Sequence, residues 1–155
     1  MFNTIFGLPM HPLIVHATTV VVPTAAITVA LAALWPRFRT WAAYVPLGLS
    51  LVALALVPMS TSSGESLEHK LPHNALIERH AHLADGLLPW MIVVAFAAAL
   101  LLVYERRTKG AGRSVVPRWI AAGLIAVALV GSIGTGVQVA RIGHSGAEAA
   151  WSGVK

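Results

Sequence analysis

Long apolar runs separated by short polar segments dominate this chain. Four runs are long enough to cross a bilayer as helices, since about 20 apolar residues span the hydrocarbon core. They cover about residues 13–35, 42–60, 80–104 and 116–140. We therefore expect one all-α domain over residues 1–155, an integral membrane four-helix transmembrane bundle.

Proline, asparagine and tryptophan give the boundaries of these helices. His11 can cap the first helix and Pro12 suits its first turn, where a missing N–H costs nothing. Asn74 is a plausible cap for the third helix, which would start before the membrane and run to about Tyr104. Residues 36–39 lie between two tryptophans and predict an interfacial turn. The segments 66–79, 105–113 and 141–151 are read as a polar connection, a basic loop and a tail.

Composition supports the membrane assignment and excludes several kinds of site. Apolar residues make up 57% of the chain and charged residues 11%, and the mean hydropathy is +0.75. Soluble domains carry about 25% charged residues. The absence of cysteine excludes disulfides, thiolate metal sites, iron–sulfur ligation and covalent haem attachment. We expect no nucleic-acid partner for the net charge of +5, because the basic residues lie in short loops between spans.

Positive charge predicts the orientation of the bundle. The loops after the first and third runs, with the start of the fourth, hold seven Lys and Arg residues, and the opposite side holds four. The positive-inside rule places the richer side in the cytoplasm and both termini outside. All seven histidines and five of the six acidic residues then lie on the outer side.

This gathering of histidines is the candidate functional feature. His16 and His82 lie within a turn or two of the outer ends of their spans, and ionisable residues at that depth are functional candidates. A haem b site needs two imidazoles from different helices. His16 and His82 are our first choice for this cofactor-binding pair, with His11 and His144 as alternatives.

Other readings of the same residues stay open. A non-haem metal site for zinc, iron or copper could use His16, His82, Glu78 and Asp85. Helical spacing places Glu78, His82 and Asp85 on one face and points His80 elsewhere. The histidines could also form a proton-linked switch, since imidazole titrates near neutral pH. A bundle without any cofactor, whose histidines only support packing, fits the small-residue fourth run equally well.

The two ends of the chain resemble a known family. The opening stretch Leu8-Pro9-Met10-His11-Pro12-Leu13-Ile14-Val15-His16 is similar to the signature of small bacterial membrane proteins grouped as "domain of unknown function 2231". In the family's usual pattern Phe-Pro follows the second histidine, whereas Ala17-Thr18 stands here. Ser63-Gly64-Glu65, the His80/His82 region and Gly143-His144-Ser145-Gly146-Ala147 resemble later landmarks. The resemblance implies a multi-pass protein in a redox setting and favours His11, His16, His82 and His144.

The leading hypothesis is a haem b electron-transfer protein of the bacterial cytoplasmic (inner) membrane. Its expected partners are the lipid bilayer and redox proteins or a larger membrane complex. The alternatives are a cofactor-free accessory subunit and a non-haem metal binder. No substrate is indicated, so no enzyme class is assigned.

Overall fold

The computed structural model describes residues 4–5, 8–110 and 117–152, and almost all of them are helical. Two short strands, β1 (Thr4–Ile5) and β2 (Leu8–Pro9), pair antiparallel before the first helix. The helices are α1 (Met10–Leu34), α2 (Pro36–Ala42), α3 (Val45–Glu68), α4 (Ala75–Asp85), α5 (Leu87–Gly110) and α6 (Arg118–Trp151). The all-α prediction is confirmed.

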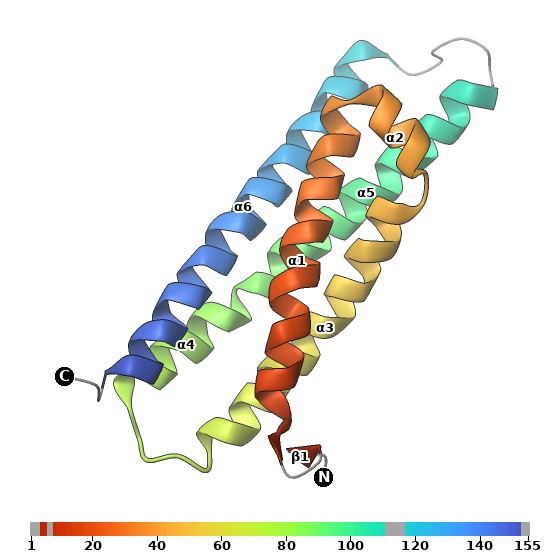
Figure 1. Ribbon diagram of the computed structural model, residues 1–155. Coiled ribbons are helices and arrows are strands. Elements are labelled where there is room, and N and C mark those ends of the chain that lie inside the picture. Colours follow the sequence, from red (N-terminus) through yellow and green to blue (C-terminus); the bar gives the residue numbers. More distant parts are fainter. Residues whose placement is uncertain (1–3, 6–7, 111–116, 153–155) are drawn as a thin grey trace.

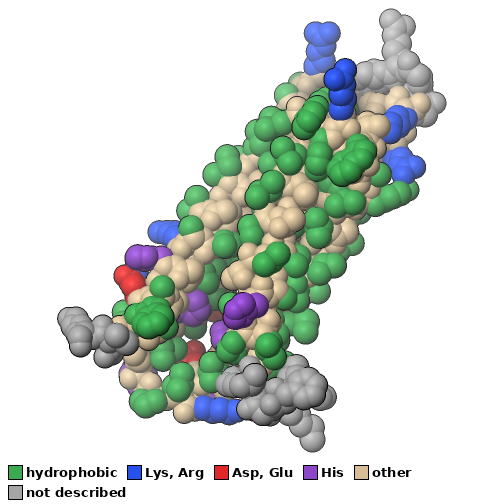
Figure 2. Space-filling model, in the orientation of Figure 1, with side chains coloured by type: hydrophobic (Ala, Val, Ile, Leu, Met, Phe, Trp, Pro, Cys, Tyr) green, Lys and Arg blue, Asp and Glu red, His purple; other side chains and the backbone are tan. Residues whose placement is uncertain are grey.

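The helices form an up-and-down bundle (Figure 1). α1 packs against α3 and α6, and α5 packs against the same two helices, so α1 and α5 are diagonal partners. α4 continues the line of α5 and lies against α6. We call the end where α1 and α4 begin and α3 and α6 finish the histidine end, and the end that carries α2 the arginine end. Figure 2 shows histidine side chains only toward the histidine end.

The bundle has the length and surface of a membrane domain. Four helical segments are long and apolar enough to cross a bilayer: Met10–Leu34, Val45–Glu68, Ala75–Lys109 and Arg118–Trp151. Large apolar side chains such as Val20, Phe96 and Ile133 are exposed on their outward faces. In water such a surface would be costly, whereas lipid tails solvate it. The prediction of four transmembrane helices is confirmed by length and composition.

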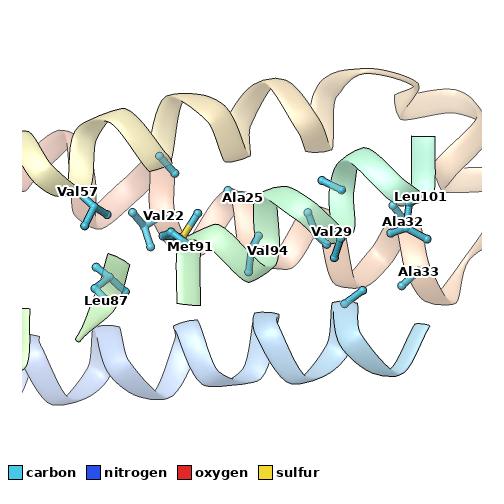
Figure 3. Packing of buried hydrophobic residues seen from close by; sticks show 14 residues of the cluster. Val22, Ala25, Val29, Ala32, Ala33, Val57, Leu87, Met91, Val94 and Leu101 are labelled. Carbon is cyan, nitrogen blue, oxygen red and sulfur yellow. The ribbon is translucent and has the colours of Figure 1, made fainter. Parts of the chain in front are cut away.

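Small and medium apolar side chains fill the interior (Figure 3). Val22, Val29, Met91, Val94 and Leu101 belong to one buried cluster with several alanines. α6 meets α5 closely at two of its glycines, Gly131 and Gly134. A Cβ at residue 134 would overlap the Trp90 ring, so the indole lies directly against the α6 backbone. Small residues thus provide tight packing in a solvent that gives apolar side chains little reason to associate.

Several helices continue beyond the expected spans. α3 runs to Glu68 through residues read as a polar connection, and α6 runs to Trp151 through the residues read as a tail. Residues 36–39, read as a turn, belong to α2, and residues 105–110 of the expected basic loop belong to α5. Residues 111–116, which include the rest of that loop and the predicted start of the fourth span, lie outside the described residues. Loss of hydrophobicity marked the exit from the bilayer, not the end of the helix.

The third predicted helix is divided at Gly86. Asn74 caps its start as predicted, since its side-chain oxygen accepts a hydrogen bond from the Leu76 N–H at 2.9 Å. Pro89 has no N–H to offer the carbonyl four residues earlier, which disfavours an unbroken helix here. Gln138 of α6 donates a hydrogen bond from Nε2 to the Leu83 carbonyl at 2.5 Å. α4 is therefore a separate element, held to α6 by a side chain.

Candidate functional site

His11 reaches from the start of α1 to the last turns of α3. Its Nδ1 lies 3.2 Å from the Ser60 carbonyl oxygen and 3.1 Å from Ser63 Oγ. The imidazole passes directly over Gly64, where an added Cβ would lie 3.1 Å from Cε1 of the ring. His11 was predicted to cap α1. The helix already begins at Met10, so His11 lies inside its first turn and is not the cap. Its ring joins α1 to α3.

The partners of Nδ1 determine the tautomer of the His11 ring. A carbonyl oxygen can only accept a hydrogen bond. Ser63 donates its hydroxyl proton to the Ser60 carbonyl at 2.9 Å, so its Oγ also faces the ring as an acceptor. Nδ1 must therefore carry the proton, and the lone pair of a neutral His11 ring lies on Nε2.

His80 makes the same contacts from the opposite side of the bundle. Its Nδ1 lies 3.1 Å from the Ile142 carbonyl oxygen and 3.1 Å from Ser145 Oγ, both on α6. Ser145 donates to the Ile142 carbonyl at 3.0 Å, so both groups again accept from Nδ1–H. An added Cβ at Gly146 would lie 3.0 Å from Cε1 of His80. Both rings consequently have the same tautomer, and each lies against a Ser-Gly dipeptide of the neighbouring helix.

The two imidazoles both lie at the histidine end of the bundle, one at the start of α1 and one on α4. They come from α1 and from α4, which extends the diagonal helix α5. Among the described residues, no hydrogen bond is made to Nε2 of either ring. α4 buries none of its residues. Figure 2 shows the surface hollowed between α1 and α6 at this end, with histidine side chains beside the hollow.

The other predicted cofactor ligands lie farther out. The His16 ring is exposed, and its Nδ1 bonds the Pro12 carbonyl of the preceding turn at 2.6 Å. His82 is also exposed. His144 Nε2 pairs with Glu148 Oε1 at 3.2 Å on the surface of α6. Within the described residues, none of these three rings is anchored to another helix as His11 and His80 are.

The residues expected to form a non-haem metal site are not gathered. The described residues contain no group of three or more His, Cys, Asp or Glu side chains that could hold a metal ion. Glu78, His82 and Asp85 are exposed on α4, and Glu78 pairs with His73 at 3.8 Å. His80 points away from these three residues, toward α6, as helical spacing predicts.

A pocket of about 460 Å³ lies where α3 passes into α4. Glu65, Glu68, His69, Leu71, Pro72, His73, Asn74 and Ile77 line it. It is open, and neither His11 nor His80 is among its walls. This pocket is therefore a feature of the connecting segment, separate from the anchored imidazoles.

Sequence reasoning placed His80 outside the candidate site, although the structure makes it the counterpart of His11. Its helix face carried no other ionisable residue that suggested a role. The available signal was that two of the three Ser-Gly dipeptides, at 63–64 and 145–146, lie near the end of a long apolar run. The contact needs this dipeptide because the serine accepts a hydrogen bond from the ring and the glycine leaves room for the ring beside the helix backbone.

The comparisons with known proteins agree with this structure. A family described as "Predicted membrane protein (DUF2231)" matches residues 7–154. The chain belongs to that family. The match includes both anchored histidines and the Ser-Gly dipeptides that they contact, and it confirms the resemblance seen in the sequence. No curated protein and no solved structure matches the chain.

Proposed function

We propose that this member of the family binds haem b between His11 and His80 and transfers electrons at the histidine end. One observation carries the proposal. Two imidazoles from diagonally related elements each donate Nδ1–H to a main-chain carbonyl, which leaves the Nε2 lone pairs available. Metal-ligating histidines nearly always make such a bond with the nitrogen that does not ligate.

The number of anchored ligands favours haem over a metal ion held by protein alone. Zinc and non-haem iron sites draw three or more ligands from the protein. The porphyrin supplies four of the iron's ligands, so two imidazoles complete the set. The structure offers two anchored imidazoles and, among its described residues, no cluster of three metal-ligating groups. The donor set therefore fits haem b.

The residues of this chain would hold and orient the group. His11 and His80 would hold the iron through their Nε2 nitrogens, while Ser63 and Ser145 would keep their rings in the tautomer that this requires. The bound iron would supply one-electron redox chemistry. No residue of α4 is fully buried, and Glu78 and His82 are exposed. A redox partner protein or a larger membrane complex would exchange electrons there.

A second candidate function is a cofactor-free accessory subunit. The observation in its favour is that each anchored imidazole already joins two helices, α1 to α3 and α4 to α6. Histidines with only that role would leave the protein colourless. Their loss would reduce stability and nothing else.

The absorption spectrum separates these candidates. The protein would be produced with ample haem supply, purified in detergent, and measured oxidised and then reduced with dithionite. The proposal predicts a Soret band and sharp α and β bands on reduction, with about one haem per chain by pyridine haemochrome. A colourless protein whose metal analysis is also empty would leave the accessory-subunit function. Bound metal without a Soret band would point to a non-haem site.

We further propose that the histidine end faces the outside of a bacterial cytoplasmic membrane. The support is the excess of Lys and Arg at the arginine end. Because the chain has no cysteine, a single Cys introduced at exposed His73 reports its own accessibility. A membrane-impermeant maleimide should label His73→Cys in intact cells and leave Arg106→Cys unlabelled. The reverse pattern would invert the orientation.

A further inference from the structure

The buried positions of the chain repeat between its two halves. In α1, Thr18, Val22, Ala25, Ala26, Val29 and Ala32 are buried, and the residues 69 positions later in α5, Leu87, Met91, Val94, Ala95, Ala98 and Leu101, are buried as well. In α3, Pro46, Ser50 and Ala53 are buried, and so are Ala128, Ser132 and Thr135, 82 positions later in α6. Six of the seven buried positions of α1 and three of the four buried positions of α3 thus have buried counterparts, and Ala33 and Val57 are the exceptions.

The anchored histidines follow the same two offsets. His80 lies 69 positions after His11, the spacing that relates α1 to α5. Ser145-Gly146 lies 82 positions after Ser63-Gly64, the spacing that relates α3 to α6. Matching hydrogen bonds and matching glycine contacts accompany these offsets. α1 with α3, and α4–α5 with α6, are therefore equivalent hairpins.

We propose that the histidine end consists of two equivalent half-sites, and that Ser63 and Ser145 are positioning residues for the imidazoles of His11 and His80. Each serine accepts Nδ1–H together with a carbonyl, and each following glycine lets the ring lie against the helix backbone. This inference deepens the proposed haem site and rests on it for its redox consequence.

Removal of either serine should change the reduction potential in the same direction. A hydrogen bond from Nδ1–H to an acceptor raises the basicity of the ligating nitrogen, which stabilises the oxidised iron. Ser63→Ala and Ser145→Ala each leave only the carbonyl as acceptor. The potential of each variant should therefore rise, by comparable amounts, and the double variant should show about the sum.

The chain offers a matched pair of controls. Ser50 and Ser132 are buried on the same two helices, 13 positions before Ser63 and Ser145 respectively. They are also related to each other by the 82-residue offset. Ser50→Ala and Ser132→Ala should leave the potential unchanged, while Ser63→Thr and Ser145→Thr should restore it by retaining the hydroxyl. An unchanged potential in both Ser63→Ala and Ser145→Ala, or a shift in only one of them, would overturn the proposal of equivalent half-sites.

A second readout does not need haem. In the protein labelled with ¹⁵N-histidine and kept free of haem, NMR should show His11 and His80 protonated at Nδ1. Each Ser→Ala variant should speed solvent exchange of that proton several-fold, only at the ring the serine contacts. This result in a protein that never takes up haem would retain the half-sites and sink the haem function. Protonation of both rings at Nε2 would overturn the half-sites, with or without haem.

Discussion

The two ends of the bundle use their polar groups in opposite ways. At the arginine end, Arg39 Nε donates to Glu105 Oε2 at 2.9 Å, and the side chains of both residues are only 12% exposed. Glu105 also accepts from Thr40 at 2.7 Å and lies 3.4 Å from the Lys109 ammonium. Both oxygens of this carboxylate are thus satisfied within the protein.

At the histidine end, strong anchoring is combined with unused bonding capacity. His11 and His80 are each tied to a neighbouring helix through one nitrogen, and the second nitrogen has no hydrogen bond within the described part of the chain. The ion pairs here are exposed, and α4 buries no residue. The contrast supports a division in which the arginine end stabilises the fold and the histidine end holds the two imidazoles that we propose as ligands.

The largest expected loss of stability comes from Glu105→Ala. The change leaves the largely buried Arg39 guanidinium without its carboxylate partner. The loss of stability should lie between that for breaking an exposed ion pair, which is small, and that for breaking a fully buried one, which is several kcal/mol. We expect about 2 kcal/mol less stability, measured by thermal unfolding in detergent. Haem content should not change in the folded fraction. Haem loss without destabilisation would contradict the division between the two ends.

Gln138→Leu tests how the histidine end is joined to the rest of the bundle. The variant leaves the Leu83 carbonyl without its donor next to the break at Gly86, which should cost about 1.5 kcal/mol. Val137→Leu, one position away on an exposed face, serves as the control. Hydrogen exchange should increase in α4 more than in α5. Equal increases in both helices would argue against α4 as a separate element.

Asn74→Ala should have a smaller effect. It removes the cap of α4 and should cost about 1 kcal/mol, whereas Asn74→Asp keeps an acceptor and should cost less. Circular dichroism with thermal melting would measure both variants. Equal losses for the two substitutions would show that the side-chain cap does not stabilise α4.

The smallest effect is expected for Arg79→Ala. Its ion pair with Glu148, at 3.1 Å, joins side chains that are 60% and 38% exposed. Exposed pairs contribute little because water already solvates both charges, so we expect a loss below about 0.5 kcal/mol. A melting temperature as low as that of Glu105→Ala would remove the energetic distinction between the ends.

The sequence predicted the arrangement of spans better than the arrangement of the site. Four apolar runs are a strong signal, because each must be long enough for the bilayer. The cap at Asn74 was also predicted, since it depends on residues two apart. The extension of α3 to Glu68 was not, because hydropathy records the solvent around a helix and not its backbone hydrogen bonds.

The candidate site was harder to predict because its contacts join distant residues. His11 meets Ser63 across 52 positions and His80 meets Ser145 across 65. Helical spacing showed that His80 leaves the face of His82, but spacing on one helix cannot show what the other face meets. The 69-residue offset between the histidines and the 82-residue offset between the Ser-Gly dipeptides were visible in the chain. The structure was needed to show that each histidine contacts one of these dipeptides.

The most direct test of the central claim is the haem content of four histidine variants measured side by side. We predict that His11→Ala and His80→Ala each lose at least nine-tenths of the Soret absorbance per folded chain. The same substitution at exposed His16 or His82 should leave it close to wild type. Loss of the band in His16→Ala and His82→Ala, with retention in the other two, would contradict the assignment of the anchored imidazoles as the ligands.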